Sequence, residues 1–555
     1  MDYLKLAELN EKLESTSKRL EQTSLITEFI KSASKENLRP VVLMVLGNVY
    51  PSYSRKKIGI ADKIMIKAIA STSGRSEKEI VKIFKKTGDL GAVAEQVLKD
   101  KKQATLFSKK LSISDVFEDI KKIADFEGKG TVDKKISIIK KLLANASPVE
   151  AKHIARLVIG TTRMGVGEGI VRDAIAGAFN VDSKKVENAE NILNDYGGVA
   201  EIAKLEGDKG LESIKLELFK PSKVLLAQRV ESIEELFKRT GEPADLEYKY
   251  DGFRVLIHKK GDKVKLFTRR LEDVTKQFPD VVEYSNKYIK DSRCIMDSEV
   301  IGIEPKTGRW LPFQKISQRI KRKYDIKKIV KEIPVIVNVF DVLMINGKSL
   351  LKTPLKERIK LIEENITQEK NRFVIAKRII SSDEKEVRKF FMESLALGNE
   401  GIMGKNLNSI YEPGLRVGYW VKLKPAMEPL DLAITGADWG KGKRAQWLAS
   451  FDISCRKQDE FKRIGKMGTG LTDENFKKLT KELKPYIIRE KGTHVDIIPK
   501  IVVEVGYEEI QESPTYESGY ALRFPKLLQI RYEKDVSEVD DIEKIKSLYS
   551  HQRGK

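Results

Sequence analysis

The spacing of apolar residues changes twice along the chain, and this change limits the folds that are open to it. From Met1 to about Lys204 they recur three and four residues apart, as in KKISIIKKLLANA, which is typical of amphipathic helices. From about Leu218 they alternate or form short blocks such as PVIVNVFDVLMI, which is typical of strands. After Lys424, short strand patterns alternate with glycine-rich turns, as expected for a small barrel.

These changes predict three domains in a chain of 555 residues. We expect a helical domain over 1–215, an α/β domain over 216–425 and a small β domain over 426–555. Two cysteines exclude a four-thiolate zinc module and a disulfide framework. The sequence shows no signal peptide and no apolar run of the roughly 18 residues that a membrane helix needs. We therefore expect a soluble, cytoplasmic monomer without a membrane partner.

The chain carries 104 lysines and arginines against 82 aspartates and glutamates, a formal charge of +22. A charge of this sign attracts polyanions, and nucleic acid is the obvious candidate. The alternative is a protein of a hot-growing organism whose charges form solvated ion-pair networks. Charge alone leaves both interpretations open.

The stretch LEYKYDGFRV places Lys249 two residues before an Asp-Gly pair. Asp-Gly between alternating apolar residues is a strong hairpin signal, so this lysine could be an ordinary solvated charge. The alternative is a nucleophile, which must be uncharged and therefore needs nearby cations or burial to lower its pKa. If its target is a nucleotide α-phosphate, further cations must hold the phosphate, carboxylates must hold a metal ion, and an aromatic ring must stack on the base.

The sequence after this lysine offers each of these groups. Each also has an ordinary structural explanation, such as a core aromatic ring, a surface cation or the solvent face of an edge strand. Their order and spacing, more than any single residue, favour the catalytic interpretation. The candidate side chains are Arg254, Arg269, Glu299, Phe340, Glu400, Lys405, Arg416, Lys422 and Lys424.

The segments KYDG, TRRLEDVTKQFPDV, DSEVIG, FDVL, EGIMGK, WVKLK and ALRFPKLLQIRYEK follow one another in this order. They resemble the motifs of the ATP-dependent DNA ligases, in particular the archaeal type, and the resemblance covers nearly the whole chain. It implies a multidomain α+β fold: an all-helical N-terminal DNA-binding domain, an α/β nucleotidyltransferase core similar to ATP-grasp proteins, and a C-terminal OB-fold β-barrel.

The resemblance implies that Lys249 attacks the α-phosphate of ATP, expels pyrophosphate and becomes a lysyl-AMP phosphoramidate. AMP then passes to the 5′-phosphate of a nick in double-stranded DNA, and the 3′-hydroxyl displaces it, in replication, repair and recombination. The expected metal is Mg²⁺, with Mn²⁺ as an alternative. The resemblance implies that Glu247 and Phe340 contact adenine, that Arg254 and Glu299 contact the ribose, and that Arg269 contacts the ribose and the nick's 5′-phosphate. It implies that Arg416, Lys422 and Lys424 bind phosphate and that Glu299 and Glu400 bind the metal. It places Arg523, Arg531 and Lys534 on a moving C-terminal lid.

Two further segments are expected to contact partners. Arg163, beside glycines in TRMGVGEG, would bind DNA phosphate, although a helix–helix turn explains the same letters. The segment with Gln103 and Phe107 is similar to one that docks archaeal relatives on a sliding clamp; a charged interhelical loop is the alternative. Gly404 and Gln529 depart from the family's usual residues, and Gly404 could loosen its strand.

Other classes share the lysine motif. RNA ligases and GTP-using capping enzymes usually lack a helical domain before the lysine, and NAD-using ligases carry a four-cysteine module that two cysteines cannot form. A DNA-binding clamp that has lost catalysis is the non-enzymatic alternative. The presence of Lys249, Glu299, Glu400, Lys422 and Lys424 argues against it.

Overall fold

The computed structural model describes residues 1–54, 56, 58–99, 110–126, 130–322, 324–440, 444 and 446–552. The chain forms two compact units that interleave in sequence. Unit 1 comprises 1–227, 252–376 and 407–417, and unit 2 comprises 228–251, 377–406 and 418–555. Within the described part of the chain, every helix is too short or too polar to span a lipid bilayer.

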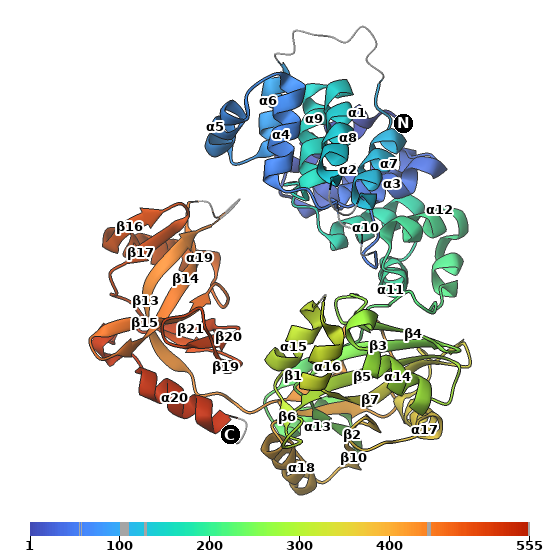
Figure 1. Cartoon of the computed structure of the whole chain (residues 1–555), viewed down its shortest axis with the longest axis vertical. Coiled ribbons are helices and arrows are strands. Elements are labelled where there is room, and N and C mark those ends of the chain that lie inside the picture. Colours follow the sequence, from blue (N-terminus) through green and yellow to red (C-terminus); the bar gives the residue numbers. More distant parts are fainter. Residues whose placement is uncertain are drawn as a thin grey trace. The chain divides into compact units, whose positions relative to one another are not determined.

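Helices form the regular structure of the N-terminal region, as its apolar spacing predicts (Figure 1). Their apolar faces share one buried core. At the start of α9, the Ser147 backbone N–H donates to the Glu150 carboxylate at 2.8 Å, and Pro148 occupies the first turn, where no backbone N–H is needed. The helices are α1 (Tyr3–Ser15), α2 (Arg19–Ser32), α3 (Lys35–Val45), α4 (Asp62–Ser73), α5 (Glu77–Thr87), α6 (Leu90–Lys99), α7 (Ile113–Asp125), α8 (Thr131–Asn145), α9 (Pro148–Ile159), α10 (Glu168–Phe179), α11 (Ser183–Leu193) and α12 (Tyr196–Ser213).

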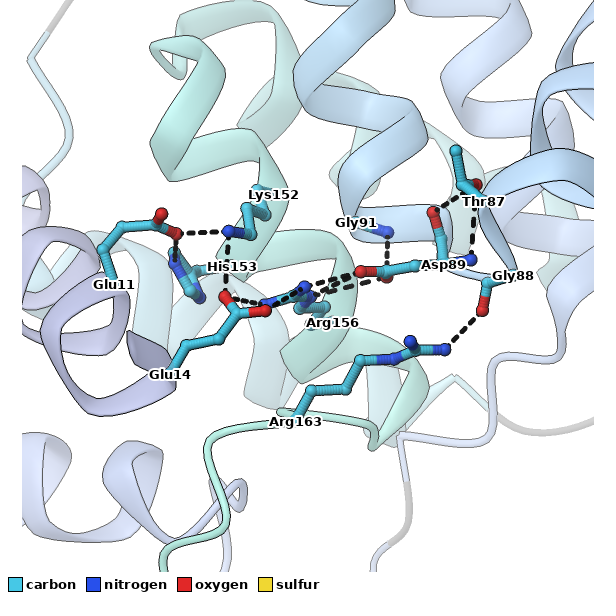
Figure 2. A network of polar contacts seen from close by, with 10 residues as sticks. All are labelled: Glu11, Glu14, Thr87, Gly88, Asp89, Gly91, Lys152, His153, Arg156 and Arg163. Atoms are coloured by element: carbon cyan, nitrogen blue, oxygen red, sulfur yellow. Dashed lines mark hydrogen bonds and ion pairs between the residues drawn. The ribbon is translucent and has the colours of Figure 1, made fainter. Parts of the chain in front are cut away.

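Charged side chains tie three of these helices together (Figure 2). Arg156 of α9 is buried and pairs with Glu14 of α1 at 2.8 Å and with Asp89, beside the start of α6, at 2.5 Å. Lys152 lies 2.6 Å from Glu11 and 2.9 Å from Glu14. Opposite charges therefore alternate along this helical network, the name used below for these five residues.

Unit 1 also contains a sheet with the strand order β4-β3-β5-β7-β8, with β6 on β5 and β9 on β7. The apolar block PVIVNVFDVLMI, which is typical of a strand, forms β7. Helices around this sheet pack apolar side chains on it. The elements are β3 (Phe253–Lys260), β4 (Lys263–Thr268), α14 (Pro279–Tyr288), β5 (Arg293–Ile303), β6 (Trp310–Leu311), α15 (Phe313–Lys321), α16 (Ile326–Glu332), β7 (Val335–Ile345), β8 (Lys348–Ser349), α17 (Leu355–Asn365) and β9 (Phe373–Ile375).

A second sheet has the order β1-β12-β11-β2-β10, and most of it belongs to unit 2. Gly404 of β11 faces α13, where a Cβ would lie 2.8 Å from Leu236 Cγ, so this glycine permits close packing of the helix on the sheet. The elements are β1 (Leu226–Val230), α13 (Ile233–Thr240), β2 (Ala244–Lys249), β10 (Arg378–Ser381), α18 (Glu384–Ala396), β11 (Gly401–Asn406) and β12 (Arg416–Leu423).

The C-terminal part of unit 2 is a small β domain with its own apolar core. Its main sheet has the order β15-β14-β13-β17-β16, with β18 on β13 and β21 on β18, while β19 pairs with β20. The elements are β13 (Leu430–Trp439), β14 (Leu448–Lys457), β15 (Glu460–Met467), α19 (Asp473–Leu483), β16 (Ile487–Lys491), β17 (His494–Ile497), β18 (Val502–Gly506), β19 (Glu509–Glu512), β20 (Tyr520–Arg523), β21 (Lys526–Ile530) and α20 (Ile542–His551).

The Asp-Gly pair after Lys249 does not close a hairpin. β2 pairs with β10 and β11, whereas β3 pairs with β4 and β5 in the other sheet. The chain therefore leaves one sheet after β2 and enters the other at β3, and Gly252 lies between these strands. A Cβ on Gly252 would lie 2.3 Å from the Val300 carbonyl oxygen. The hairpin interpretation is therefore wrong, and glycine is required because the chain runs so close to β5 at this point.

Candidate active site

One face of the second sheet carries the predicted nucleophile. Side chains alternate between the two faces of a strand, so Asp245, Glu247 and Lys249 of β2 share a face. Arg378 of β10 lies opposite Glu247, and Lys405 of β11 lies opposite Asp245. We call this surface the lysine face.

A carboxylate holds the lysine in place. Lys249 Nζ lies 2.8 Å from Glu400 Oε2, and Lys424 Nζ lies 2.8 Å from the same oxygen. Burial alone would raise the pKa of Glu400, but the ammonium groups of Lys249 and Lys424 hold it well below its ordinary range. Glu400 is therefore an ionised group that two lysines share.

Lys422 adds a third positive charge to the lysine face. It lies opposite Met403, which itself lies opposite Glu247. Burial, together with the like charges of Lys249 and Lys424, lowers the pKa of Lys422 to about 8. Positive charge is thus in excess around Glu400, and an anionic ligand would relieve that excess.

Glu247 is buried and already ion-paired. It contacts Arg378 through one oxygen and Lys405, at 2.6 Å, through the other. Lys405 in turn lies 4.2 Å from the centre of the buried Trp420 ring. The sequence motifs include Lys405 and Trp420, but they do not reveal Arg378, which comes from β10, 131 residues after Glu247.

In unit 1 the sheet holds Arg254 in a fixed orientation. Its guanidinium makes hydrogen bonds of 2.9 and 2.6 Å to Asp297 of β5 and donates to the Leu225 carbonyl oxygen at 2.6 Å. The Tyr411 hydroxyl donates to Asp297 at 2.7 Å. Sequence reasoning assigns no role to Asp297 or Tyr411; only the place of Asp297 in DSEVIG marks it.

The other residues predicted in unit 1 gather around Arg254. Its guanidinium lies 5.2 Å from the centre of the Phe340 ring, and Glu299 stands opposite it across the β3–β5 ladder. Partial burial and the positive charges of Arg254 and Arg416 lower the pKa of Arg269. Three arginines, a carboxylate and an aromatic ring therefore lie in one neighbourhood of unit 1.

The small β domain contributes Arg523, whose guanidinium lies 3.8 Å from Glu400, and Glu508, whose carboxylate lies 3.2 Å from Lys424 Nζ. These four residues also line a cavity of about 530 Å³ in unit 2. This volume falls within the range of about 300–1,000 Å³ that is common for small-molecule sites.

Arg531 and Lys534 lie away from the lysine face. Both pair with Asp431 at the start of β13, at 3.7 and 2.6 Å. Of the cations predicted in the small β domain, the structure thus brings Arg523 to Glu400 and engages the other two within the barrel.

The contacts with partners that the sequence predicts in the helical region stay predictions. Arg163 donates to the Gly88 carbonyl oxygen, so its guanidinium joins two loops of the helical region (Figure 2). Gln103 and Phe107 lie outside the described residues.

Among the described residues, the group that could hold a metal by proximity is Glu11, Glu14 and His153, with ligand atoms within 4.8 Å of one another. Lys152 pairs with both of these glutamates, so the helical network already compensates them. The cluster differs from the predicted metal ligands, Glu299 and Glu400.

The lysine face combines a lysine held by a carboxylate with further cations, an arrangement that can bind a phosphate. With the fold, this arrangement places the chain among the nucleotidyltransferases, with the core between a helical region and a small β domain in the order of the sequence.

Comparisons with known proteins also identify a nucleotidyltransferase, of the DNA ligase kind. Residues 2–176 match a family described as DNA ligase N terminus, 224–424 match ATP dependent DNA ligase domain, and 444–534 match ATP dependent DNA ligase C terminal region. The DNA ligase of Nanoarchaeum equitans is 47% identical, covering 100% of this chain and 99% of the relative. That of Thermococcus fumicolans is 42% identical with the same coverage. The solved structure Pmar-Lig_PreS3, at 16% identity, covers 95% of this chain and 99% of its own with a TM-score of 0.59, and so supports the fold.

The chain belongs to the ATP-dependent DNA ligases, and to their archaeal type. It is an enzyme that uses ATP and binds DNA.

Proposed function

We propose that Lys249 is the nucleophile that accepts AMP, with Glu400 as the group that orients it. The amine must be uncharged to attack. Its nitrogen lone pair then forms a bond to the α-phosphorus, the bond from that phosphorus to the bridging oxygen breaks, and pyrophosphate leaves with the electron pair. The nitrogen loses a proton to solvent. Because its pKa is so low, Glu400 is better suited to accept a hydrogen bond from Lys249 than to take its proton.

The remaining roles follow from the chemistry of each side chain. Lys422 and Lys424 carry the excess charge that suits a phosphate, and Arg269 and Arg416 add cations in unit 1. Phe340, half-buried, offers a ring face for a base. Glu247 accepts a hydrogen bond from the adenine amine, and Arg254 and Glu299 bind the ribose.

The donor set also fits a divalent cation of the Mg²⁺ type. Such an ion commonly binds one or two carboxylates and completes its shell with water and substrate phosphate. Glu400 in unit 2 and Glu299 in unit 1 would each offer a carboxylate oxygen to such an ion. The ion would neutralise phosphate oxygens as charge develops. Mn²⁺ prefers similar oxygen ligands.

Two transfers to DNA would follow. An oxygen of the nick's 5′-phosphate attacks the α-phosphorus of lysyl-AMP, the P–N bond breaks, and the Lys249 amine regains a proton. The 3′-hydroxyl oxygen then attacks the 5′-phosphorus, and AMP leaves. Arg523 would approach the pyrophosphate during the first step. The helical region would hold duplex DNA by phosphate contacts, which predicts strong salt dependence. The enzyme would act as a monomer in DNA replication, repair and recombination, with the segment at Gln103 and Phe107 docking on a sliding clamp.

The observation that carries this proposal is the pairing of Lys249 and Lys424 with one buried carboxylate, beside a lysine whose pKa is lowered. The test is incubation with ATP, GTP or NAD labelled in the AMP or GMP portion. We expect acid-labile label on the protein from ATP, lost in Lys249→Ala and kept in Lys265→Ala, a lysine on β4. Label from GTP would indicate a capping-type enzyme, and label retained by Lys249→Ala would show that another residue is the nucleophile.

A further inference from the structure

The chain between α12 and β1 contacts both the helical region and the residues around Arg254. We call residues 221–226 of this chain the linker. On one side, the end of α11 holds the linker by hydrogen bonds. The Asn194 side-chain amide donates to the Pro221 carbonyl oxygen at 2.6 Å, and the Lys223 backbone N–H donates to the Asn191 carbonyl oxygen at 2.8 Å.

An ion pair adds to this attachment. Lys223 Nζ lies 2.5 Å from the carboxylate of Glu190 on α11 and 3.3 Å from Glu168 at the start of α10. Glu190 is 1% exposed. Burial raises the pKa of Glu190, and the Lys223 ammonium opposes that shift. Since a buried charge is costly without a partner, the lysine and the linker are drawn to the end of α11.

On its other side, the linker contacts the group around Arg254. The Leu225 carbonyl oxygen accepts a hydrogen bond of 2.6 Å from the Arg254 guanidinium. The Leu225 backbone N–H donates to the Tyr411 hydroxyl at 3.3 Å, and that hydroxyl donates to Asp297. Both polar groups of one linker peptide residue are therefore used to hold the side chains that surround this guanidinium.

The linker also contacts the loop that leads to Arg416. The Gly414 backbone N–H donates to the Val224 carbonyl oxygen at 3.2 Å. Gly414 has a φ of +77°, and a Cβ there would lie 2.3 Å from Asn191 Oδ1, so the end of α11 packs closely against this loop. The helical region is thus attached to the linker and to a loop beside it.

We propose that Lys223 is a positioning residue for ATP binding, because it fixes the linker to α11 and so places the Leu225 carbonyl oxygen that orients Arg254. This inference rests on the proposed function, in which Arg254 binds the ribose. Asp297 holds two nitrogens of the guanidinium and the linker holds the third. A displaced linker would let the guanidinium tilt about its contact with Asp297, and a small misplacement of a binding group weakens binding.

The test measures KM and kcat for transfer of α-labelled AMP from ATP to the full-length enzyme. In Lys223→Met we expect KM to rise about five- to tenfold and kcat to stay within about twofold, because a ribose contact is made equally in the ground state and the transition state. In an Arg254→Met background the same change should add less than about twofold, since the guanidinium that the linker orients is absent.

Two further variants serve as controls. Lys223→Arg keeps the charge and should return KM to within about twofold of the unmodified enzyme. Lys185→Met removes a lysine of α11 that pairs with Asp208 and Glu212 of α12, away from the linker, and should leave KM unchanged.

A role of Lys223 in folding alone predicts a different result. Partial unfolding would reduce the amount of active enzyme and therefore kcat, and would leave KM unchanged. A KM in Lys223→Met within about twofold of the unmodified enzyme, or equal rises with and without Arg254, would overturn the inference. Should Lys223→Met fail to fold, the double variant Glu190→Gln, Lys223→Met takes its place, since it leaves no buried carboxylate without a cation.

Failure of the proposed function gives a distinct result. If Arg254 does not bind the ribose, Arg254→Met itself will have an unchanged KM, and the inference about Lys223 falls with that role. A raised KM in Arg254→Met with a normal KM in Lys223→Met overturns the inference alone.

Discussion

The helical network and the lysine face are both groups of charged side chains. In the helical network every charge contacts an opposite one, whereas around Glu400 on the lysine face positive charge is in excess. In the helical network, Glu11, Lys152, Glu14, Arg156 and Asp89 alternate in sign along α1, α9 and the start of α6 (Figure 2). Burial alone would raise the pKa of Glu14, but Arg156 and Lys152 lower it to about 2.

On the lysine face, Lys249 and Lys424 share Glu400, and Lys422 adds a third positive charge. Burial and like charges lower the pKa of Lys422 to about 8, which is the reverse of what compensation would do. The comparison teaches that a closed ion network stabilises a fold, whereas an open one leaves charge that a phosphate can satisfy. Mutations should therefore affect stability in the first group and activity in the second.

The largest effect is expected from Arg156→Met in the helical network. This change leaves Asp89 buried without its cation, and breaking a buried ion pair costs about 3–5 kcal/mol. Hydrogen exchange of amides in α1, α6 and α9 should accelerate accordingly. Arg172→Met, which removes a half-exposed pair with Asp173 and Glu187, is the control and should cost less than about 1 kcal/mol. Equal effects of the two variants would contradict the closed-network interpretation.

The next largest effect is expected from Lys422→Met on the lysine face. Loss of a positive charge that stabilises the transition state should slow AMP transfer from ATP by about 100–1,000-fold. Thermal stability near pH 7 should stay the same or increase, because the variant removes a cation from among like charges. Single-turnover labelling and a thermal melt measure the two quantities. A destabilised variant with normal transfer would show that Lys422 belongs to the structure and not to the site.

The division into helical, α/β and small β regions could be predicted from the sequence because it depends on local periodicity. The four lysines of the lysine face, Lys249, Lys405, Lys422 and Lys424, could be named because they lie in ordered motifs. The change from one sheet to the other at Gly252 could not be predicted, because Asp-Gly suits a hairpin equally well. Only the pairing of β2 and β3 with distant strands determines which of the two forms. The partners Arg378 and Tyr411 escaped for the same reason: each meets its carboxylate through contacts more than 100 residues apart in sequence.

The pH dependence of nucleotide affinity sharpens the comparison further. Lys422 loses its charge above about pH 8, so binding of a phosphate at pH 9 must first restore a proton. Affinity for an ATP analogue with an uncleavable α,β bridge should fall about tenfold from pH 7 to pH 9, with proton uptake in calorimetry. The affinity of Lys422→Arg for the analogue should not change between pH 7 and pH 9, because arginine remains charged.

The same shift has a consequence for stability with a definite sign. Since the pKa of Lys422 in the fold lies below its ordinary value of 10.5, the unfolded chain holds more protons between about pH 8 and that value. The contribution of this group to stability therefore rises with pH across that window. A melting advantage of Lys422→Met over the unmodified enzyme should shrink over the same range, and an advantage that grew with pH would contradict the assignment.

The smallest effect is expected from Glu508→Gln, which tests whether the lysine face is open in the absence of nucleotide. Glu508 lies 3.2 Å from Lys424 Nζ and is half-exposed. Burial would raise its pKa, but Lys424, Lys422 and Arg523 lower it, so an ionised carboxylate competes with phosphate for these cations. Its removal should lower the KM for ATP about two- to fivefold, most at low salt. Glu512→Gln, on the exposed end of β19, is the matched control and should leave KM unchanged. A higher KM in Glu508→Gln would mean that this carboxylate holds Lys424 in its binding position, and that the lysine face is more fully compensated than its three lysines and Glu400 suggest.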